Sequence, residues 1–293
     1  MNENEKMPGL PGILYLCATP IGNLEDMTYR AVRLMGEVPL IAAEDTRHTR
    51  KLLAHFDIHT PLISYHEHNK LDKGGELIEH LLSGKDLLLV SDAGLPGIAD
   101  PGSLLCAQAI EAGITVTPLP GANAALSALI CSGIDTTRFS FVGFLPKTMA
   151  KSKELLDEVK THRETLIFYE APHHLQATLK LLADSLGNRK AALARELTKH
   201  YEEFERGTLA ELITRYEDKE PRGEYVIIVA GFDGEEADET MEELTPQELV
   251  AKFISDGMDK KQAMREAAKK LGLSRRDVYQ ALLEANADKA DNL

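Results

Sequence analysis

Four short segments rich in glycine and proline stand out in the first half of the chain, because such residues let the backbone approach a ligand closely. They are Thr19-Pro20-Ile21-Gly22-Asn23, Ser91-Asp92-Ala93-Gly94-Leu95-Pro96, Asp100-Pro101-Gly102 and Pro118-Leu119-Pro120-Gly121-Ala122-Asn123. Each follows or lies just beyond an apolar run and precedes a helical pattern, where an open parallel sheet presents backbone donors to a ligand. Their spacing therefore predicts a binding site at one edge of a sheet.

The segment from Ser91 to Gly102 carries two carboxylates together with three glycines and two prolines. So many conformationally special residues cost stability unless the loop has a fixed shape. A stiff loop with an accessible backbone suits a flat adenosyl group held by main-chain N–H and C=O groups. Asp92 can accept hydrogen bonds from a ribose or an amino group. Asp100 either does the same or caps the helix that starts near Ser103.

A dinucleotide-binding fingerprint is the main competing interpretation of the first segment. That motif needs three spaced glycines and an acidic residue about 20 residues further on. Only Gly22 is present, although Glu44 and Asp45 end the second strand candidate. Pro20 also lacks the N–H that a pyrophosphate would use. A dinucleotide is therefore disfavoured, and a plain tight turn stays open for this segment taken alone.

Alternating apolar runs and amphipathic stretches must position these segments. The strands predicted first are 13–18, 40–43, 62–65, 87–91 and 115–118, with helices at 28–35, 46–56, 75–82, 103–112 and 123–132. This alternation predicts an α/β domain over residues 12–135, with a parallel sheet covered on both faces. A second α/β domain with mixed strand directions is predicted over 136–232. Its strands are expected at 139–144, 166–170, 191–195, 202–207 and 225–231, and its helices at 151–160, 173–183 and 208–216.

Size and composition agree with this division. The 293 residues exceed one average domain, and 43% apolar content is enough for two cores. Cys17, Cys106 and Cys131 lack Cys-x-x-Cys spacing and lie in apolar runs, so they are interpreted as buried residues in a reducing compartment. The sequence contains no signal-peptide pattern and no apolar stretch of membrane-spanning length, which predicts a cytoplasmic protein.

Charge is distributed unevenly along the chain. The net charge of −14 argues against simple nucleic-acid binding, but much of the excess lies in residues 233–244, which have the composition of a solvated linker. Beyond this linker, helix-capping patterns occur at Thr245 with Glu248, at Asp259, and at Ser274 with Asp277. Residues 245–293 are therefore predicted to form a three-helix, helix-turn-helix-like domain, which serves either nucleic acid or packing.

Seven blocks of the chain together resemble the ribosomal RNA small subunit methyltransferase I family of the tetrapyrrole methylase superfamily. The blocks are Thr19 to Leu24, Ala43 to Arg47, Ser91 to Gly94, Asp100 to Gly102, Pro120 to Ala122, Gly143 to Lys147 and Ala194 to Lys199. The resemblance implies S-adenosylmethionine-dependent 2′-O-methylation of a cytidine in the decoding region of small-subunit (16S) ribosomal RNA. It also implies a two-domain tetrapyrrole-methylase-like α/β fold, with a small C-terminal helical domain.

The resemblance further implies a cleft between the two α/β domains that holds S-adenosylmethionine. Matched motif by motif, its contacts are expected at Pro20, Ile21, Gly22, Asp92, Ala93, Gly94, Pro96, Gly121, Ala122, Asn123 and Ala124. In the second domain, Tyr169, Glu170, Arg195 and Glu196 are expected to close over the cofactor or the target nucleotide. The first segment lacks the Gly-x-Gly-x-Gly run typical of tetrapyrrole enzymes, which weakens a porphyrin or corrin assignment.

Methyl transfer from a sulfonium is an in-line displacement that depends mainly on positioning. A ribose 2′-hydroxyl is a poor nucleophile at neutral pH, so an acceptor for its proton is expected nearby. The candidates are Glu44 and Asp45, after the second predicted strand, and His66 and His68, after the third. Which of them takes the proton stays open.

These candidates also have simpler structural interpretations. Glu44 and Asp45 can start a helix that has Arg47 as a partner. Two histidines one residue apart can bind zinc, but no third ligand with suitable spacing is nearby, so no metal is predicted. Arg195 and Glu196 can form a buried structural pair between the domains.

Contact with RNA must come from local basic surfaces, because the total charge is negative. The candidates are Arg47, Arg50, Lys51, Lys147, Lys151, Lys153 and the C-terminal helices. The expected partner is 16S ribosomal RNA in the small ribosomal subunit, and the resemblance implies a homodimer. Two alternatives stay open. One is a small-molecule, tetrapyrrole-type methyltransferase with the same cofactor cleft, and the other is a noncatalytic metabolite sensor whose C-terminal domain binds nucleic acid.

Overall fold

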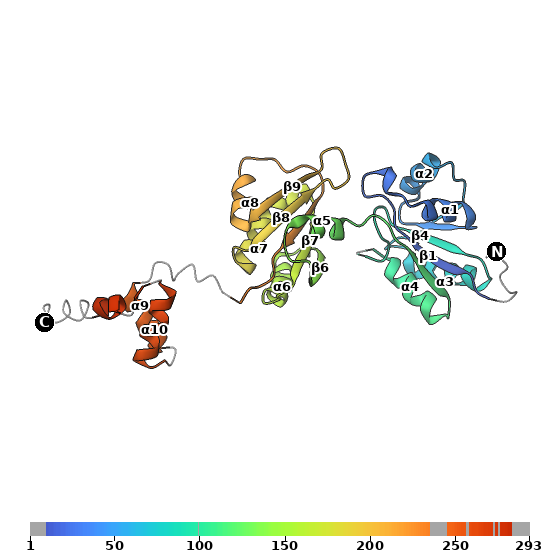
Figure 1. The fold of residues 1–293 in the computed structure, drawn as a ribbon. Helices are drawn as coiled ribbons and strands as arrows, with labels where there is room; N and C mark the ends of the chain where they lie inside the picture. Colours follow the sequence, from blue (N-terminus) through green and yellow to red (C-terminus); the bar gives the residue numbers. More distant parts are fainter. Residues whose placement is uncertain are drawn as a thin grey trace. The chain divides into compact units, whose positions relative to one another are not determined.

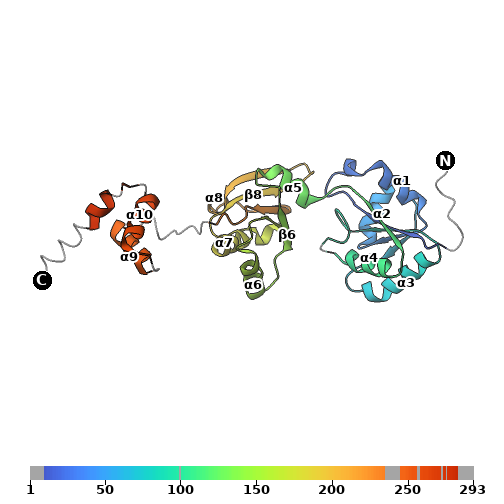
Figure 2. The same cartoon turned by 60° about the horizontal axis from the view of Figure 1, so that its bottom comes forward.

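The chain folds into two compact units, Met1–Asp233 and Gly234–Leu293. A computed structural model describes residues 10–98, 100–234, 245–255, 258–271, 273–274 and 276–282. The first unit contains two five-stranded sheets with helices on their faces, and the second unit is helical (Figure 1 and Figure 2). This α/β architecture with C-terminal helices confirms the fold class predicted from the sequence.

The first sheet is parallel throughout, in the order β3-β2-β4-β1-β5. Its strands are β1 (Ile13–Cys17), β2 (Ile41–Ala43), β3 (Leu62–Ser64), β4 (Leu87–Val90) and β5 (Thr115–Leu119). The helices α1 (Tyr29–Glu37) and α2 (Thr46–His55) cover one face, and α3 (Lys70–Leu82) and α4 (Gly102–Glu111) cover the other (Figure 2). A short 3-10 helix, η1 (Leu24–Asp26), precedes α1.

Burial on both faces explains why the central strand β4 is apolar without interruption. Leu88 and Val90 pack into the core under α1 and α2, whereas Leu87 and Leu89 pack into the core under α3 and α4. Successive strand residues point to opposite faces, so a strand buried on both sides needs apolar residues at every position. Because all strands are parallel, the loops after β1, β2, β4 and β5 gather at one edge of this sheet.

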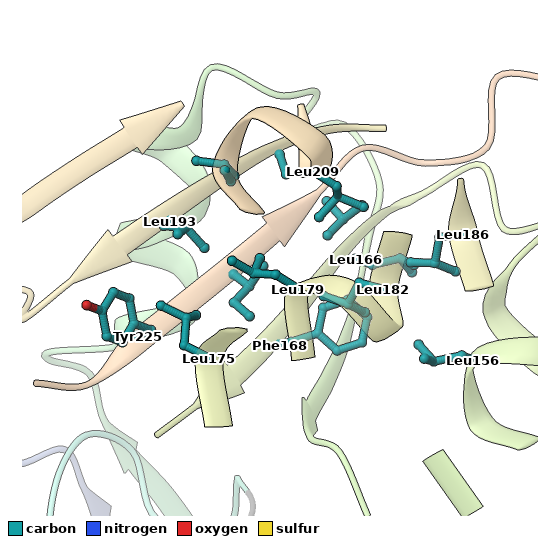
Figure 3. Close-up of a cluster of buried hydrophobic side chains, with 14 of the residues drawn as sticks. Leu156, Leu166, Phe168, Leu175, Leu179, Leu182, Leu186, Leu193, Leu209 and Tyr225 are labelled. Atoms are coloured by element: carbon teal, nitrogen blue, oxygen red, sulfur yellow. The ribbon is translucent and has the colours of Figure 1, made fainter. Parts of the chain in front are cut away.

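The second sheet is mixed, in the order β6-β7-β10-β8-β9. Its strands are β6 (Phe139–Phe144), β7 (Thr165–Glu170), β8 (Lys190–Arg195), β9 (Glu203–Thr208) and β10 (Tyr225–Val229), and only β6 and β7 pair in parallel. One face is covered by α6 (Met149–Val159), α7 (Leu175–Leu186), which follows the 3-10 helix η2 (Pro172–His174), and α8 (Leu209–Arg215). Figure 3 shows this core, in which Leu175, Leu179 and Leu182 of α7 gather with Phe168 of β7.

Helix α5 (Ala124–Ser132) covers the other face of the second sheet, although it directly follows β5 of the first sheet (Figure 1). Ala125, Ala128 and Leu129 form a core with β7, β8 and β10. The chain therefore passes from the first sheet to the second between β5 and α5. The domain boundary between residues 135 and 136 stays a prediction. Helix α5 lies before that boundary in the sequence but packs on the second sheet.

The second unit has its own small core, to which Leu249, Val250, Ala263, Ala267 and Val278 contribute. Its helices are α9 (Pro246–Ser255), α10 (Lys260–Lys270) and a helical segment at 276–282. All three predicted caps are formed, at Thr245 with Glu248, at Asp259, and at Ser274 with Asp277. Gly257 and Gly272, which follow the first and second of these helix patterns in the sequence, lie outside the described residues, as do residues 235–244 of the predicted linker.

The prediction that all three cysteines are buried is wrong for Cys131. Cys17 is buried in the first sheet, where burial raises the pKa of its thiol to about 12. Cys106 is half-buried, and Cys131 is exposed because the last turn of α5 turns this residue away from the sheet. Among the described residues, no helix has the length and apolar character that crossing a membrane requires.

Candidate functional site

A cavity of about 400 Å³ lies where the carboxyl-end loops of the first sheet meet one edge of the second sheet. Small-molecule sites commonly fall in the range of about 300–1,000 Å³. We call its first side the loop wall, which consists of Ile21, Glu44, Ser91, Asp92, Ala93, Gly94, Leu95, Ile98, Asp100, Asn123 and Ala124. We call its second side the strand wall, which consists of Phe144, Tyr169, Glu170, Ala171, Ala194, Leu197, Lys199, Glu224, Tyr225 and Val226.

A hydrogen bond joins the loop after β2 to the loop after β4. The Asp92 carboxylate accepts it from the backbone N–H of Asp45, with an N–O distance of 3.1 Å. Burial and the neighbouring Asp92 charge raise the pKa of Glu44, although the backbone N–H of Asp92 faces this carboxyl and favours its charged form. Glu44 is thus a carboxyl in the cavity whose proton affinity exceeds that of a free one.

Asp100 fixes the shape of the glycine-rich loop. Its carboxylate accepts hydrogen bonds from the backbone N–H of Gly97, at 2.8 and 2.9 Å, and of Gly102, the first residue of α4, at 2.7 Å. Gly97 has a φ of +89°, which a residue with a side chain would adopt only under strain. The N-cap of α4 is Pro101, whose side chain makes no capping hydrogen bond. Asp100 instead satisfies the first N–H of this helix from the residue before the N-cap, and the same side chain lines the cavity. Burial raises its pKa.

The first glycine segment holds the two walls together. Thr19 and Gly94 exchange two backbone hydrogen bonds, of 2.9 and 3.0 Å, which fix the loops after β1 and β4 side by side. Gly22 lies against the second sheet, because a Cβ there would come within 2.4 Å of Cγ of Lys199 and 3.2 Å of the Leu197 carbonyl oxygen. This close approach requires a glycine at position 22, although Gly22 is not among the residues that line the cavity.

The N-terminus of α5 opens onto the cavity. The Asn123 side chain caps this helix by accepting the backbone N–H of Leu126 at 2.9 Å. The Tyr169 hydroxyl faces the backbone N–H of Ala125 in the first turn of the same helix. Burial raises the pKa of Tyr169, so its hydroxyl stays protonated at neutral pH. Residues of both walls therefore partner the first turn of one helix.

Glu170 ends β7 in the strand wall and is only 8% exposed. Its carboxylate accepts hydrogen bonds from the Thr178 hydroxyl of α7, at 2.5 Å, and from the backbone N–H of Ala171, at 2.8 Å. A buried charge of this kind needs such partners to offset the loss of water. The pair fixes the end of β7 beside the cavity.

Lys199 is the cation of the strand wall. Its ammonium group contacts the carboxylates of Glu196 and Glu224, with N–O distances of 2.8 and 2.9 Å. Burial alone would lower the pKa of Lys199, but these two hydrogen bonds outweigh it and raise the pKa. The backbone beside it is strained, because Glu196 and Thr198 have φ values of +49° and +66°. Such conformations cost about 1–3 kcal/mol each and concentrate at ligand sites.

Comparison with known proteins assigns the chain to a family. Residues 14–213 match the family described as Tetrapyrrole (Corrin/Porphyrin) Methylases. The chain is 51% identical to the ribosomal RNA small subunit methyltransferase I of Bacillus subtilis over 273 residues, which cover 92% of this chain and 94% of that protein. The corresponding protein of Halalkalibacterium halodurans is 50% identical over 271 residues, which cover 92% and 93%. The chain belongs to the ribosomal RNA small subunit methyltransferase I family.

A solved structure shows the same fold in a distant protein. The uroporphyrin-III-C-methyltransferase of Thermus thermophilus superimposes with a TM-score of 0.53 at 19% identity, over 74% of this chain and 94% of that protein. The family therefore shares the tetrapyrrole methylase fold. The expected resemblance is confirmed, and the protein is a methyltransferase.

In this methyltransferase, nine of the residues predicted for the site line the cavity. They are Ile21, Glu44, Asp92, Ala93, Gly94, Asn123, Ala124, Tyr169 and Glu170. The others lie outside the lining, namely Pro20, Gly22, Asp45, His66, His68, Pro96, Gly121, Ala122, Arg195 and Glu196. Two of these contact Lys199 of the strand wall. Gly22 packs closely against its side chain, and Glu196 forms an ion pair with its ammonium group.

The four candidates for the proton acceptor are separated by the structure. Glu44 lines the cavity, whereas Asp45 caps α2 and pairs with the exposed Arg47 at 2.7 Å, which lowers the pKa of Asp45. His66 is half-buried, and its Nδ1 has no hydrogen-bond partner among the described residues. His68 is exposed, with its ring centroid 6.0 Å from that of His66. In the described part of the chain, no group of three or more His, Cys, Asp or Glu side chains forms a metal site.

The interpretation of Arg195 and Glu196 as a structural pair is wrong. Arg195 donates hydrogen bonds to Glu203, at 3.1 Å, and to the Arg222 carbonyl oxygen, at 2.7 Å. Glu196 instead accepts from Lys199 and from the backbone N–H of Glu224. The two side chains have different partners because β8 ends at Arg195 and the backbone adopts a left-handed conformation at Glu196.

The strand wall contains most of the residues that sequence reasoning missed. Four of them, Phe144, Ala194, Leu197 and Lys199, lie within two of the family blocks, so a signal was present for these. Tyr225 and Val226 are ordinary strand residues outside the blocks, and nothing in their types separates them from the rest of the core. Their place in the wall follows from how the second sheet meets the loops of the first.

Proposed function

We propose that this protein transfers the methyl group of S-adenosylmethionine to the 2′-hydroxyl of a cytidine in the decoding region of 16S ribosomal RNA. The observation that carries the proposal is the loop wall, in which glycine-rich backbone and the carboxyls of Glu44, Asp92 and Asp100 face one cavity. The names of relatives up to 51% identical support ribosomal RNA as the acceptor. The cytidine and its ribose position come from the family resemblance of the sequence blocks.

The chemistry of the cavity fits S-adenosylmethionine. Carboxylates of the loop wall suit its ribose hydroxyls, its ammonium group and its positive sulfonium, since each either donates hydrogen bonds or is cationic. Ile21, Leu95, Leu197 and Val226 offer apolar surface for the adenine ring. When bound, this cofactor supplies an electrophilic methyl group. The protein would hold it with the backbone of 91–95 and with the start of α5 at Asn123 and Ala124. Of these residues, Asp92, Ala93, Gly94, Asn123 and Ala124 are predicted from the sequence.

Within this proposal, Glu44 is the residue that takes the proton of the acceptor hydroxyl. It is the candidate whose side chain lines the cavity, and its raised pKa brings it nearer to neutral pH than an ordinary carboxylate. Asp92 already accepts a hydrogen bond from the backbone N–H of Asp45 in the loop after β2, and Asp100 accepts from backbone N–H groups of its own loop. The backbone N–H of Asp92 faces the Glu44 carboxyl.

The acceptor is proposed to be the small ribosomal subunit rather than free RNA, and the enzyme to act in the cytoplasm as a homodimer. A folded particle with splayed nucleotides can be recognised by shape, which a chain of net charge −14 needs more than phosphate attraction. Lys147, Lys151 and Lys153 give one local basic surface at the start of α6.

The proposal is tested by incubating the protein with methyl-labelled S-adenosylmethionine and three separate acceptors. These are small ribosomal subunits lacking ribose methylation, naked 16S RNA, and uroporphyrinogen III as a tetrapyrrole. Label in the subunit alone, or more in the subunit than in naked RNA, is the expected result. Label in the tetrapyrrole without label in RNA would refute the proposal in favour of a small-molecule methyltransferase.

A further inference from the structure

Phe144 is a large aromatic residue that lines the cavity and yet is 59% exposed. It is the last residue of β6, the edge strand of the second sheet. A single exposed aromatic residue needs no explanation. Phe144 differs because the backbone of β6 departs from regular geometry just before it, and that departure decides which face of the sheet its ring occupies.

The pairing of β6 with β7 contains a β-bulge at Val142. Phe141 pairs with Ile167, but the next pairs are Gly143 with Phe168 and Phe144 with Tyr169, so Val142 is an extra residue. Gly143 has a φ of +76°, a left-handed conformation that glycine adopts without strain. In a regular strand, residues three apart point to opposite faces. The bulge instead places Phe144 on the face of Phe141 and Tyr169, which is the face of α5 and the cavity.

The bulge thereby assembles three aromatic rings on the cavity side of the sheet. The Tyr169 ring packs edge-on against Phe141, with centroids 5.0 Å apart, and against Phe144, with centroids 5.6 Å apart. Tyr169 is itself partly buried and packs against the core between the sheet and α5. Phe144 is therefore held at one edge by a rigid neighbour, while most of its surface stays open. Bulges that aim a side chain in this way are frequent next to active sites.

The geometry points to Phe144 as a stacking surface for a nucleobase, and we infer that this base belongs to the acceptor nucleotide. The inference rests on the proposed function and deepens it. RNA-binding proteins commonly hold splayed bases by stacking them on aromatic rings. The exposed lysines Lys147 and Lys151 follow Phe144 along the chain and suit the phosphates that accompany an acceptor base. The adenine of the cofactor is the other possible source of a base, and the test separates the two.

The test measures two quantities for each variant. One is KM for small ribosomal subunits lacking ribose methylation, measured at saturating cofactor. The other is the Kd for S-adenosylhomocysteine, measured by titration calorimetry without the cofactor. For F144A we expect KM to rise about 10- to 100-fold, the usual effect of removing one base-stacking ring, while the Kd stays unchanged. F144Y should behave as the wild type, and F144L should resemble F144A because it keeps apolar bulk but no ring.

Phe139 provides a matched control on the same strand. It is also exposed, at 43%, but it begins β6 and does not line the cavity. F139A should leave both KM and Kd at their wild-type values. An unchanged KM in F144A, or full activity in F144L, would overturn the stacking role. A weaker Kd for S-adenosylhomocysteine with an unchanged KM would assign the ring to the cofactor and overturn our choice of base. If the wild type transferred no methyl group to the subunits, the proposed function itself would fail.

Discussion

The two walls of the cavity are built in different ways. The loop wall consists of loops at the carboxyl ends of parallel strands, and its polar groups are carboxylates fixed by backbone N–H donors. The strand wall consists mainly of strand residues, with an aromatic cluster and one lysine between two glutamates. We propose that the loops hold most of the cofactor and take the proton, while the aromatic cluster of the strand wall shapes the place for the acceptor.

The largest effect is expected from E44Q, which removes the proposed proton acceptor from the loop wall. General-base catalysis contributes about 100- to 10,000-fold, so kcat should fall within that range. The wild-type kcat should rise with pH through the raised pKa of Glu44 and then level off, and E44Q should lack this acidic limb. The control E111Q, at the exposed end of α4, should keep the wild-type profile. A wild-type pH profile in E44Q would remove Glu44 from the mechanism.

The same substitution predicts a gain in stability. Because burial raises the pKa of Glu44, the folded state binds its proton more tightly than the unfolded state does. The stabilising contribution of Glu44 is therefore complete below the ordinary carboxyl pKa and is lost as pH rises through the raised value. E44Q should melt at a higher temperature than the wild type at neutral pH, and the difference should shrink in acid. A variant that melts lower at neutral pH would contradict the assigned direction of the pKa.

The joint between the walls is tested by G22A. An added Cβ would lie 2.4 Å from Cγ of Lys199, so the segment after β8 must move. We expect the Kd for S-adenosylhomocysteine to weaken at least about tenfold, equivalent to about 1.4 kcal/mol. G75A is the matched control, because Gly75 lies in α3 with no atom within 4 Å of an added Cβ. If G22A and G75A bound equally well, the two walls would not depend on this contact.

The buried end of β7 is tested by T178V. The substitution removes the hydroxyl that donates to Glu170 at 2.5 Å and leaves a buried carboxylate with one partner fewer. Unfolding measured in urea should show a loss of about 1–3 kcal/mol. T178S, which keeps the hydroxyl, should lose less. Equal losses in the two variants would indicate that packing, and not the hydrogen bond, matters at this position.

The smallest effect is expected from removing residues 245–293. The cavity lies wholly within the first unit, and the second unit has a separate core. The Kd for S-adenosylhomocysteine should therefore stay within about twofold of the wild type, as expected for independent sites. A much weaker Kd in this variant would contradict the independence of the two units.

The sequence predicted the loop wall well and the strand wall poorly, for a physical reason. A residue such as Gly94 or Asp92 differs in type from its surroundings, and its place after a parallel strand fixes where it lies. Tyr225 and Val226 are typical strand residues, and they line the cavity only because α5 and the loops of the first sheet leave their end of the second sheet open. The bulge at Val142 likewise arises from the pairing of β6 with β7, and no local sequence pattern predicts that pairing register.

Several residues that their motifs predict for the site lie outside the cavity lining and contact a lining residue instead. Gly22 and Glu196 belong to family blocks, and the structure gives each a contact with Lys199. Asp45 shares a block with Glu44, but neighbouring residues diverge where a strand ends and a helix begins, so Asp45 caps α2 instead. A sequence motif marks the neighbourhood of a site, whereas the direction of each side chain depends on the fold.

The proposed 2′-O-methylation is tested by mapping where the methyl group goes. Small ribosomal subunits lacking ribose methylation are labelled with this protein and methyl-labelled S-adenosylmethionine, and their RNA is then hydrolysed in alkali. Because a 2′-O-methyl group blocks alkaline cleavage, we expect all label in one resistant dinucleotide that contains a cytidine of the decoding region. Label released as a base-methylated mononucleotide, or label at a ribose elsewhere in the RNA, would contradict it.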